Sequence, residues 1–226
     1  MVIGAHCLDA EVMAGGVIAK VTSRGHKATI IHVTKGERGH PFKRQEEFGE
    51  QLNYEMKKAA QVLGADVIWM GFPAGNLPIS DSISAKLFDI LVYLSPTHII
   101  THWKGSWHPR HVSTHYNVID AIKRALKHGK INLSGLYFGE NCEDLTGFSP
   151  TLYIDISEVK ELWLRALESY ELFRLSRELK DIIPYVGYYL TMAKIRGYEA
   201  GVPYAQAFME SKKIYDLGKE QYFIIV

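Results

Sequence analysis

Two patterns of hydrophobic and polar positions alternate along the first 130 residues. Short runs rich in β-branched and apolar residues have the length and composition of buried strands. They occupy residues 2–5, 28–33, 67–70 and 98–101. Longer segments, in which apolar residues recur every three or four positions, predict helices. These occupy about residues 10–23, 42–63, 82–94 and 109–128. Strands that alternate with helices of this length predict a Rossmann-like α/β fold, with a mostly parallel sheet covered by helices on both faces.

The second half of the chain is less regular. Residues 136–138 and 152–156 have the composition of two further strands, and a long helical stretch begins near Ser157 and is broken near Pro184. No internal repeat, low-complexity linker or charge run marks a boundary between domains. We therefore expect residues 1–226 to form a single domain, which is an ordinary size for one hydrophobic core.

Composition narrows the range of partners. The formal net charge is +1, which gives no electrostatic reason to expect binding to nucleic acid or to an anionic membrane. No apolar run approaches the roughly 18 residues of a membrane span, and the first residues lack the pattern of a signal peptide. With only two cysteines, Cys7 and Cys142, a disulfide framework is excluded and a reducing compartment is favoured. We expect a cytoplasmic protein.

The first candidate for chemistry is the turn after the first predicted strand. His6 and Asp9 lie there, three residues apart, at the edge where parallel sheets bind ligands near a switch in strand order. Both side chains can reach one ion from such a turn. The alternative is structural, with Asp9 capping the helix and His6 hydrogen-bonded at the edge of the core.

A cluster of histidines follows the fourth predicted strand. Five of the ten histidines fall between residues 98 and 115, namely His98, His102, His108, His111 and His115. His108 and His111 flank Pro109, which suits the first position of a helix. If the first and fourth strands are neighbours, His111 faces His6 and Asp9. Two imidazoles and a carboxylate, with open positions for water, form the ligand pattern of a catalytic zinc site.

Five sequence blocks, in order from residue 5 to residue 208, resemble those of the LmbE-like, or PIG-L type, N-acetylglucosaminyl deacetylases. AHCLDAEVMAGG at residues 5–16 is similar to the AHPDD-x-E…GG opening of that family. VTKGERG at 33–39 and GFPAGNL at 71–77 resemble its next two blocks, LT-R-GE-x-G and GFPDG-x-L. HPRH at 108–111 resembles HPDH, and RGYEAGVPYAQAF at 196–208 resembles the closing G-x-x-x-G-V-x-YAE-x-F.

The resemblance implies a zinc-dependent hydrolase that removes an N-acyl (acetyl) group from a small molecule of the N-acetylglucosamine type. Carried over by position, it makes His6, Asp9 and His111 the zinc ligands. It makes His108 the histidine that stabilises the oxyanion of the tetrahedral intermediate, as a cationic imidazole can. Zinc would lower the pKa of a water to roughly 7 and polarise the amide oxygen.

The chain departs from the family pattern at several acidic positions. Leu8 stands where the family has its general-base aspartate, so no carboxylate accepts a proton there. Ala74 replaces the aspartate of the GFPDG block, Arg110 that of the HPDH block, and Gln206 the late glutamate. The family's proline in the first block is Cys7.

Three residues are candidates to replace the missing base: Glu11, Glu37 and Cys7. Each has a structural alternative, because Glu11 also suits the first turn of a helix, Glu37 can cap or bind Lys35, and Cys7 can fill space. General-base catalysis typically contributes about 10²–10⁴-fold. The rival hypothesis is therefore a catalytically impaired relative that binds metal together with a sugar or a partner protein. A third hypothesis is a protein of the same fold that binds no metal.

Other features stay open at the level of sequence. His111 and His115, four residues apart, can share a helix face and bind one metal, although surface pairs of this kind also occur without metal. Lys35 and Arg38 can grip a sugar or phosphate or stay solvated, and Trp103 and Trp107 can stack on a sugar ring or pack. Members of the resembling family are often homo-oligomers, and the apolar residues 182–189 suit either an interface or a core helix.

Overall fold

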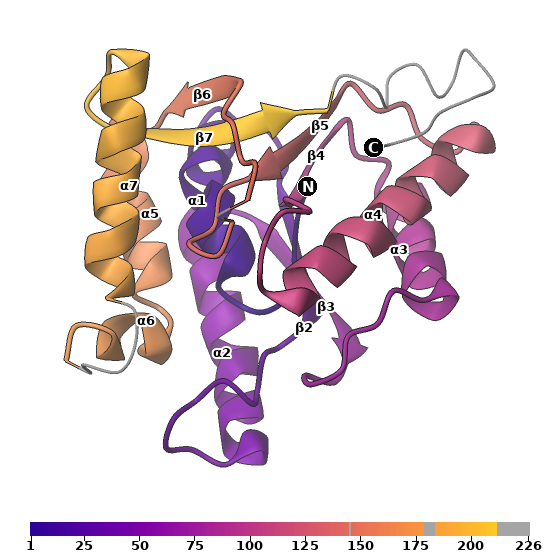
Figure 1. The fold of residues 1–226 in the computed structure, drawn as a ribbon, viewed down its shortest axis with the longest axis horizontal. Helices are drawn as coiled ribbons and strands as arrows, with labels where there is room; N and C mark the ends of the chain where they lie inside the picture. The colour runs from indigo at the N-terminus through magenta and orange to yellow at the C-terminus, as the bar shows by residue number, and fades with distance from the viewer. Residues whose placement is uncertain (145, 179–183, 212–226) are drawn as a thin grey trace.

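The computed structural model describes residues 1–144, 146–178 and 184–211. Its centre is a seven-stranded sheet with the order β3-β2-β1-β4-β5-β7-β6 (Figure 1). The strands are β1 (Val2–Gly4), β2 (Thr29–Thr34), β3 (Asp66–Phe72), β4 (His98–His102), β5 (Gly135–Gly139), β6 (Leu152–Asp155) and β7 (Ala205–Glu210). The first five strands pair in parallel, and β7 is antiparallel to both of its neighbours. The mostly parallel sheet predicted from the sequence is confirmed.

Helices cover both faces of the sheet, as Figure 1 shows. The helices on one face are α1 (Asp9–Thr22), α2 (Gln45–Leu63), α5 (Lys160–Leu167), α6 (Glu171–Leu175) and α7 (Tyr185–Ala200). Those on the other face are α3 (Asp81–Leu94) and α4 (Pro109–Lys127). Among the described residues, no helix combines the length and apolarity needed to cross a membrane.

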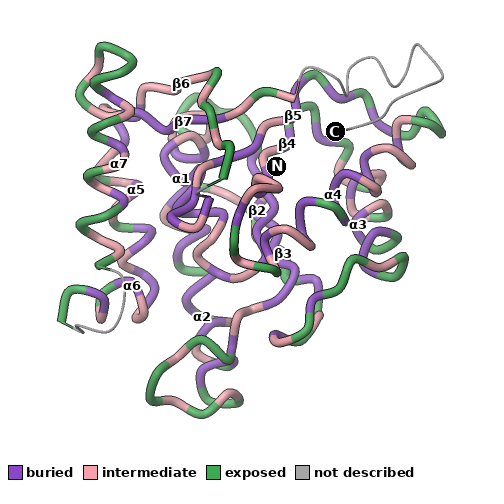
Figure 2. The backbone as a smooth tube through the Cα atoms, viewed as in Figure 1, coloured by how far each residue is buried: buried purple, intermediate pink, exposed green. Residues whose placement is uncertain are grey.

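Successive strand residues point to opposite faces, which divides the core in two. In β1, Val2 packs with the α1 side and Ile3 with the α3 and α4 side, and in β2 Ile30 and Ile31 divide in the same way. All four side chains are buried, so these strands lie in the interior of the molecule (Figure 2). Strands buried on both faces explain why the sequence shows continuous apolar runs rather than alternation.

The pairing of β1 with both β2 and β4 places the switch in strand order between β1 and β4. Val2 pairs with Ile30 on one side and with Ile100 on the other. The chain therefore leaves the sheet in opposite directions after these two strands, and the crevice at their carboxyl ends is the position where such sheets bind ligands. The neighbouring placement of the first and fourth strands, on which the predicted site depends, is present in the structure.

The region after residue 156 differs from the predicted long helix. It forms a short 3-10 turn, η1 (Ser157–Val159), and then the separate helices α5, α6 and α7. One break lies at Tyr170, whose hydroxyl donates to the carboxylate of Glu11 at 2.6 Å, and the backbone N–H of Glu171 donates to Glu55 Oε1 at 2.9 Å. Strand β7 was not expected, and it completes the sheet between β5 and β6.

Candidate metal centre and active site

The loop after β1 is shaped by tight packing and by one carboxylate. A Cβ on Gly4 would meet the Ala10 nitrogen and the Asp9 Cβ, both at 3.0 Å, so a side chain at residue 4 would push against the start of α1. Asp9 Oδ2 accepts the backbone N–H of His6 at 2.8 Å. Leu8, between them, has a φ of 82°, a left-handed conformation that is costly for leucine. The strain lies at the position where the resembling family has its base.

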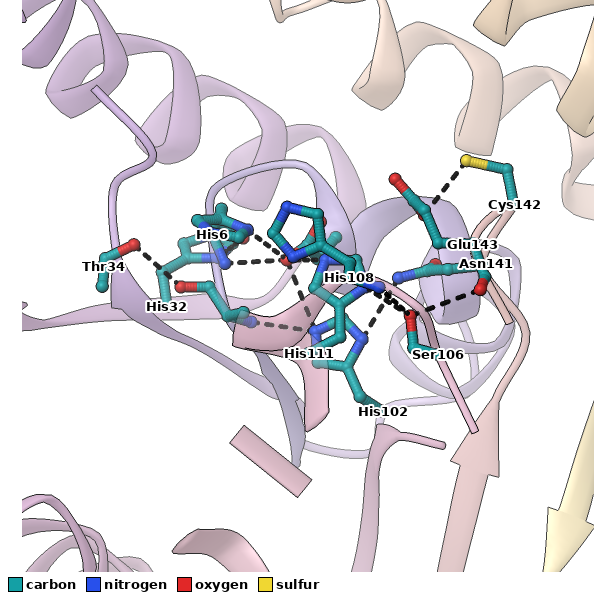
Figure 3. A network of polar contacts seen from close by, with 12 residues as sticks. His6, His32, Thr34, His102, Ser106, His108, His111, Asn141, Cys142 and Glu143 are labelled. Atoms are coloured by element: carbon teal, nitrogen blue, oxygen red, sulfur yellow. Dashed lines mark hydrogen bonds and ion pairs between the residues drawn. The ribbon is translucent and has the colours of Figure 1, made fainter. Parts of the chain in front are cut away.

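Three of the predicted site residues meet at this loop. His6 Nδ1 lies 3.1 Å from Asp9 Oδ2, and His111 Nε2, from the first turn of α4, lies 3.4 Å from the same oxygen. The ring centroids of His6 and His111 are 5.6 Å apart. Figure 3 shows both rings turned toward a common point. The chain therefore brings together side chains that are about 100 residues apart in sequence.

The two distances from Asp9 Oδ2, to His6 and to His111, suit a tetrahedral metal. Four ligands placed at about 2.0–2.1 Å from a zinc ion stand about 3.3–3.4 Å from one another, which is close to the separations around Asp9 Oδ2. His108 belongs to the same cluster, because one nitrogen each of His6, His108 and His111 lie within 4.8 Å of one another. The donor set is of the nitrogen and oxygen kind that zinc prefers.

His102, at the end of β4, forms a second group of possible metal ligands with Asp9 and His111, with one ligand atom of each within 4.8 Å of the others. Its Nε2 lies 3.4 Å from Asp9 Oδ2, yet the same nitrogen accepts the backbone N–H of Ala5 at 2.9 Å. Its Nδ1 lies 3.2 Å from the side-chain amide of Asn141. With both nitrogens engaged, the ring stacks flat on His111 at 4.0 Å between centroids and fixes that ring in place.

Burial and neighbouring charges set the protonation of the cluster. Burial alone would raise the pKa of Asp9, but the adjacent His111 and His6 outweigh it and hold that pKa well below its usual value. Burial and the neighbouring His111 and His6 lower the pKa of His108 to about 4. Asp9 is thus an anion, and His108 is a neutral imidazole at pH 7 rather than the cationic group expected from the sequence.

A cavity of about 300 Å³ opens above the cluster. Loops that follow β1, β2, β3, β4 and β5 all contribute to its wall, together with α7 and the segment before α6. Its lining residues include His6, Cys7, Leu8, Asp9, Lys35, Arg38, Gly75, His108, Arg110, His111, Glu143, Tyr170, Tyr185 and Tyr189. The cavity is therefore built at the switch point of the sheet, with the histidines on its floor.

The two glutamates predicted as substitute bases do not line this cavity. Glu11 is completely buried, with Oε1 accepting the Tyr170 hydroxyl at 2.6 Å and lying 3.2 Å from His32 Nε2. Glu37 is buried in the loop after β2, where its Oε1 accepts the backbone N–H of Ala74 at 2.9 Å. Cys7 does line the cavity, but burial raises the pKa of its thiol well above the ordinary value.

One carboxylate of the cavity wall was missed from the sequence. Glu143 follows β5 and lines the cavity together with His108 and His111. Its Oε2 accepts the thiol of Cys142 at 3.1 Å (Figure 3). Its backbone carbonyl accepts the N–H of Trp107 at 3.1 Å. The signal was available, because residues 139–144, GENCED, follow a strand whose carboxyl end faces the same crevice.

Three other candidates from the sequence lie outside the cavity, in contact with other protein groups or with solvent. His115 Nδ1 donates to the carbonyl of His102 at 2.9 Å, and its ring packs on Phe138. The indole N–H of Trp103 donates to the Thr146 carbonyl at 2.8 Å, and Trp107 is 72% exposed. None of these three residues lines the cavity, whereas Lys35, Arg38 and Arg110 do.

Gln206 shows that one departure from the family pattern is structural. Its side chain enters the middle of α1, where Oε1 accepts the N–H of Val17 at 3.0 Å and Nε2 donates to the carbonyl of Val12 at 3.0 Å. An amide can both accept and donate, which an ionised glutamate cannot do. This position does not line the cavity.

Comparison with known proteins decides the family. The family description "PIG-L: GlcNAc-PI de-N-acetylase" matches residues 1–122, which is more than half of the chain. The chain belongs to the PIG-L family. The resemblance noted in the sequence is confirmed, and the matched region carries His6, Asp9, His108 and His111.

Solved structures share the fold of this PIG-L protein over almost its whole length. The conserved protein TT1542 from Thermus thermophilus has a TM-score of 0.79 at 24% identity, covering 92% of each chain. N,N'-diacetylchitobiose deacetylase from Pyrococcus horikoshii has a TM-score of 0.77 at 22% identity, covering 93% of this chain and 82% of its own. GalB, the 4-carboxy-2-hydroxymuconate hydratase from Pseudomonas putida, has a TM-score of 0.79 at 18% identity, covering 92% and 94%. One fold thus carries a deacetylase and a hydratase, and the reaction must be argued from the site.

Proposed function

We propose that this PIG-L protein is a zinc-dependent N-deacetylase that hydrolyses the N-acetyl group of a small molecule of the N-acetylglucosamine type. The observation that carries the proposal is the position of Asp9 Oδ2, 3.1 Å from His6 Nδ1 and 3.4 Å from His111 Nε2 on the floor of the cavity. A bound zinc ion would supply a Lewis acid for the amide carbonyl and a water of lowered pKa. Family membership supports the same reaction.

The residues around the cluster have separate roles in amide hydrolysis. A metal requires neutral imidazoles at His6 and His111 and an ionised carboxylate at Asp9. The lowered pKa values of His111 and Asp9 favour those states. His108 can donate an N–H to the amide oxygen as negative charge develops there. Its pKa of about 4 means that it does so as a neutral hydrogen-bond donor at pH 7, not as a cation.

Glu143 is the residue that we assign as general base in place of the missing aspartate. It is the cavity carboxylate that does not belong to the histidine cluster, since Asp9 is committed to His6 and His111. In the reaction, Glu143 takes a proton from the attacking water, the carbon–nitrogen bond breaks, and the proton passes to the leaving amine. Acetate and a free amino sugar are the products.

One tyrosine of the cavity suits a sugar ring. Tyr170, Tyr185 and Tyr189 line the cavity, but Tyr170 and Tyr189 are buried, with their hydroxyls bonded to Glu11 and to the backbone N–H of Cys142. Tyr185 is half-buried and stacks on Tyr189 with the planes 21° apart, so it can offer a polar tip and an apolar face to a pyranose. Tyr185 and Tyr189 come from the segment considered as an interface, of which residues 182 and 183 lie outside the described residues.

The test compares four proteins on one panel of N-acetylglucosamine conjugates: wild type, Glu143→Gln, Leu8→Asp and the double variant. We expect Glu143→Gln to lower the rate of acetate release by about 10²–10⁴-fold with zinc content unchanged. Leu8→Asp restores the family's carboxylate, so it should raise the rate modestly in the wild type and strongly in the Glu143→Gln background. Glu47→Gln, an exposed glutamate on α2, is the control.

Two outcomes would contradict this assignment in different ways. If Glu143→Gln keeps full activity, the base is another group and Glu11, Glu37 and Cys7 become the next variants to make. If all four proteins bind zinc and none releases acetate, the catalytically impaired relative that binds metal and a sugar or partner is the better function.

A further inference from the structure

The wall of the cavity beside the histidine cluster carries an excess of positive charge. Lys35 follows β2, Arg38 belongs to the same loop, and Arg110 lies in the first turn of α4. The carboxylates of the cavity wall are Asp9 and Glu143. Asp9 lies among histidines and Glu143 accepts the Cys142 thiol, and neither carboxylate forms an ion pair with these three cations.

The two arginines converge on one glycine of the loop after β3. A Cβ on Gly75 would stand 2.7 Å from Nη1 and 3.1 Å from Cζ of Arg38, so that guanidinium occupies the space that a side chain would fill. Arg110 donates from Nε to the carbonyl oxygen of the same Gly75. Two guanidinium groups, one from the loop after β2 and one from α4, thus lie against a single residue.

Neutral acceptors hold these cations and leave their charge uncompensated. Arg38 Nε donates to Gln45 Oε1 at 3.0 Å, and Lys35 Nζ donates to the Gly49 carbonyl at 3.0 Å while lying over the Trp69 ring. Within the described part of the chain, no carboxylate lies in ion-pair distance of Lys35, Arg38 or Arg110. The terminal nitrogens of both arginines have no hydrogen-bond partner among those residues.

We propose that Arg38 and Arg110, supported by Lys35, form a subsite for an oxyanion carried by the substrate, either a phosphate or a carboxylate on the amino sugar. Arg38 is exposed and Arg110 is half-buried, so an anion can reach both from the cavity, and its binding relieves the repulsion between the like charges. A planar guanidinium offers two parallel N–H groups that match such an anion. The proposal rests on the proposed function for the sugar part of the substrate and adds the chemical class of its substituent.

The residues beside the arginines point the same way. Ala74, which lines the cavity next to Gly75, is apolar, and Arg110 is itself a cation. A neutral sugar would gain little from this wall. An acidic sugar would be attracted to it.

Binding, measured apart from turnover, is the decisive experiment. Calorimetry on the purified protein would compare N-acetylglucosamine with N-acetylglucosamine 6-phosphate, N-acetylglucosamine 1-phosphate and N-acetylmuramic acid, which carries a carboxylate. We expect at least one acidic sugar to bind about 10- to 100-fold more tightly than the neutral one, as hydrogen bonds to charged groups allow. Arg38→Gln and Arg110→Gln should each remove most of this preference.

Matched variants separate a binding role from a general effect of charge. Lys86→Gln removes an exposed cation on α3 outside the cavity and should leave the preference unchanged. Arg110→Lys keeps the charge but loses the forked donor, so part of the preference should remain. An equal affinity for neutral and acidic sugars, or a preference that survives in the double arginine variant, would overturn the subsite.

Inorganic phosphate distinguishes an anion on the substrate from a free anion. If phosphate alone binds as tightly as the sugar phosphates and does not compete with them, the substrate-borne anion is wrong. Acetate release then tests the proposed function independently. If acidic sugars bind through the arginines but no acetate is released, the anion subsite is supported and the deacetylase function is refuted. If acetate is released from neutral sugars and acidic sugars bind no more tightly, the deacetylase function is supported and the anion subsite is refuted.

Discussion

Asp9 and Glu11 are two carboxylates in the first turn of α1, two residues apart, yet their surroundings are opposite. Asp9 lines the cavity and has His6, His102 and His111 within 3.4 Å of its Oδ2. Glu11 is fully buried on the other side of the helix. Two positions on a helix are about 200° apart, so neighbours in sequence face different environments.

The partners of Glu11 show what the second carboxylate does. Tyr170 donates to it from the turn before α6, and His32 reaches it from β2. His32 also donates from Nδ1 to the carbonyl oxygen of His6 at 3.0 Å. Burial lowers the pKa of His32, but the charge of Glu11 outweighs it and the pKa is raised. Glu11 thus connects three elements beneath the loop that holds His6, while Asp9 remains available to a cation.

The largest expected effect in this comparison is the loss of metal from Asp9→Asn. The amide keeps the shape of the side chain but removes the negative charge that His6 and His111 surround. Because even groups that only orient a ligand change metal affinity by about 10–100-fold, we expect a loss of at least about 100-fold here. Elemental analysis after desalting, with a zinc titration, measures it. Retention of one zinc per chain by the variant would disprove the site.

Glu11→Gln should instead cost stability and spare the metal. It leaves a buried His32 without its anionic partner, for which we expect a loss of about 3 kcal/mol in the free energy of unfolding. A raised histidine pKa contributes stability that is present below the unfolded pKa and is lost as pH rises through the folded pKa. The difference from wild type in urea unfolding should therefore be larger at pH 6 than at pH 9.

The control for Glu11→Gln is Tyr170→Phe, which removes one hydrogen bond to the same carboxylate and leaves its charge. We expect about 1–2 kcal/mol of destabilisation from that variant. Both proteins should still bind zinc. If the Glu11→Gln protein loses zinc under conditions in which it is still folded, Glu11 and Asp9 both contribute to metal binding.

Another buried carboxylate, Asp144, sharpens the comparison because it forms no ion pair within the described part of the chain. Burial raises its pKa to about 7, although its Oδ2 accepts the N–H of Asn141 at 2.8 Å. A raised carboxyl pKa means that stability is present below the unfolded pKa and is lost between about pH 4 and pH 7. Asp144→Asn should therefore be more stable than wild type at pH 8, by about 2–4 kcal/mol, and nearly equal at pH 4.

Urea unfolding at several pH values checks this, with Asp89→Asn on the exposed face of α3 as the control. For Asp89→Asn the difference from wild type should not follow the same pH course. A constant difference for Asp144→Asn from pH 4 to pH 8 would show that Asp144 does not titrate in this range in the folded protein.

The strands and turns that hold the site could be predicted because the pattern of apolar residues is strong in the first half of the sequence. Continuous apolar runs identified β1 to β5, and the rule for parallel sheets then placed His6, Asp9 and His111 at one edge. Strand β7 was missed because residues 205–210, AQAFME, contain no β-branched residue. Its Gln206 is positioned by hydrogen bonds to α1 that no local pattern reports.

The parts of the site that could not be predicted depend on contacts between distant segments. The burial of Glu11 depends on Tyr170, which is 159 residues away. The arginine pair depends on the loop at Gly75, and Glu143 reaches the cavity only because β5 lies beside β4. The sequence motifs identified candidate ligands and bases, but they could not show which carboxylates face the cavity.

The smallest expected effect belongs to His115, which sits four residues after His111 and is the sequence's alternative ligand. Its Nδ1 donates to the carbonyl of His102, and burial lowers its pKa to about 4, so it is a neutral packing residue at pH 7. Asparagine can keep the donor at that place while removing the ring. We therefore expect His115→Asn to retain zinc within error while its unfolding free energy falls by about 1–3 kcal/mol from lost packing against Phe138. Elemental analysis and urea unfolding on the same preparation separate the two effects. If His115→Asn loses as much zinc as Asp9→Asn, the metal is bound by His111 and His115 instead. In that case, replacement of His6 should leave the zinc content unchanged.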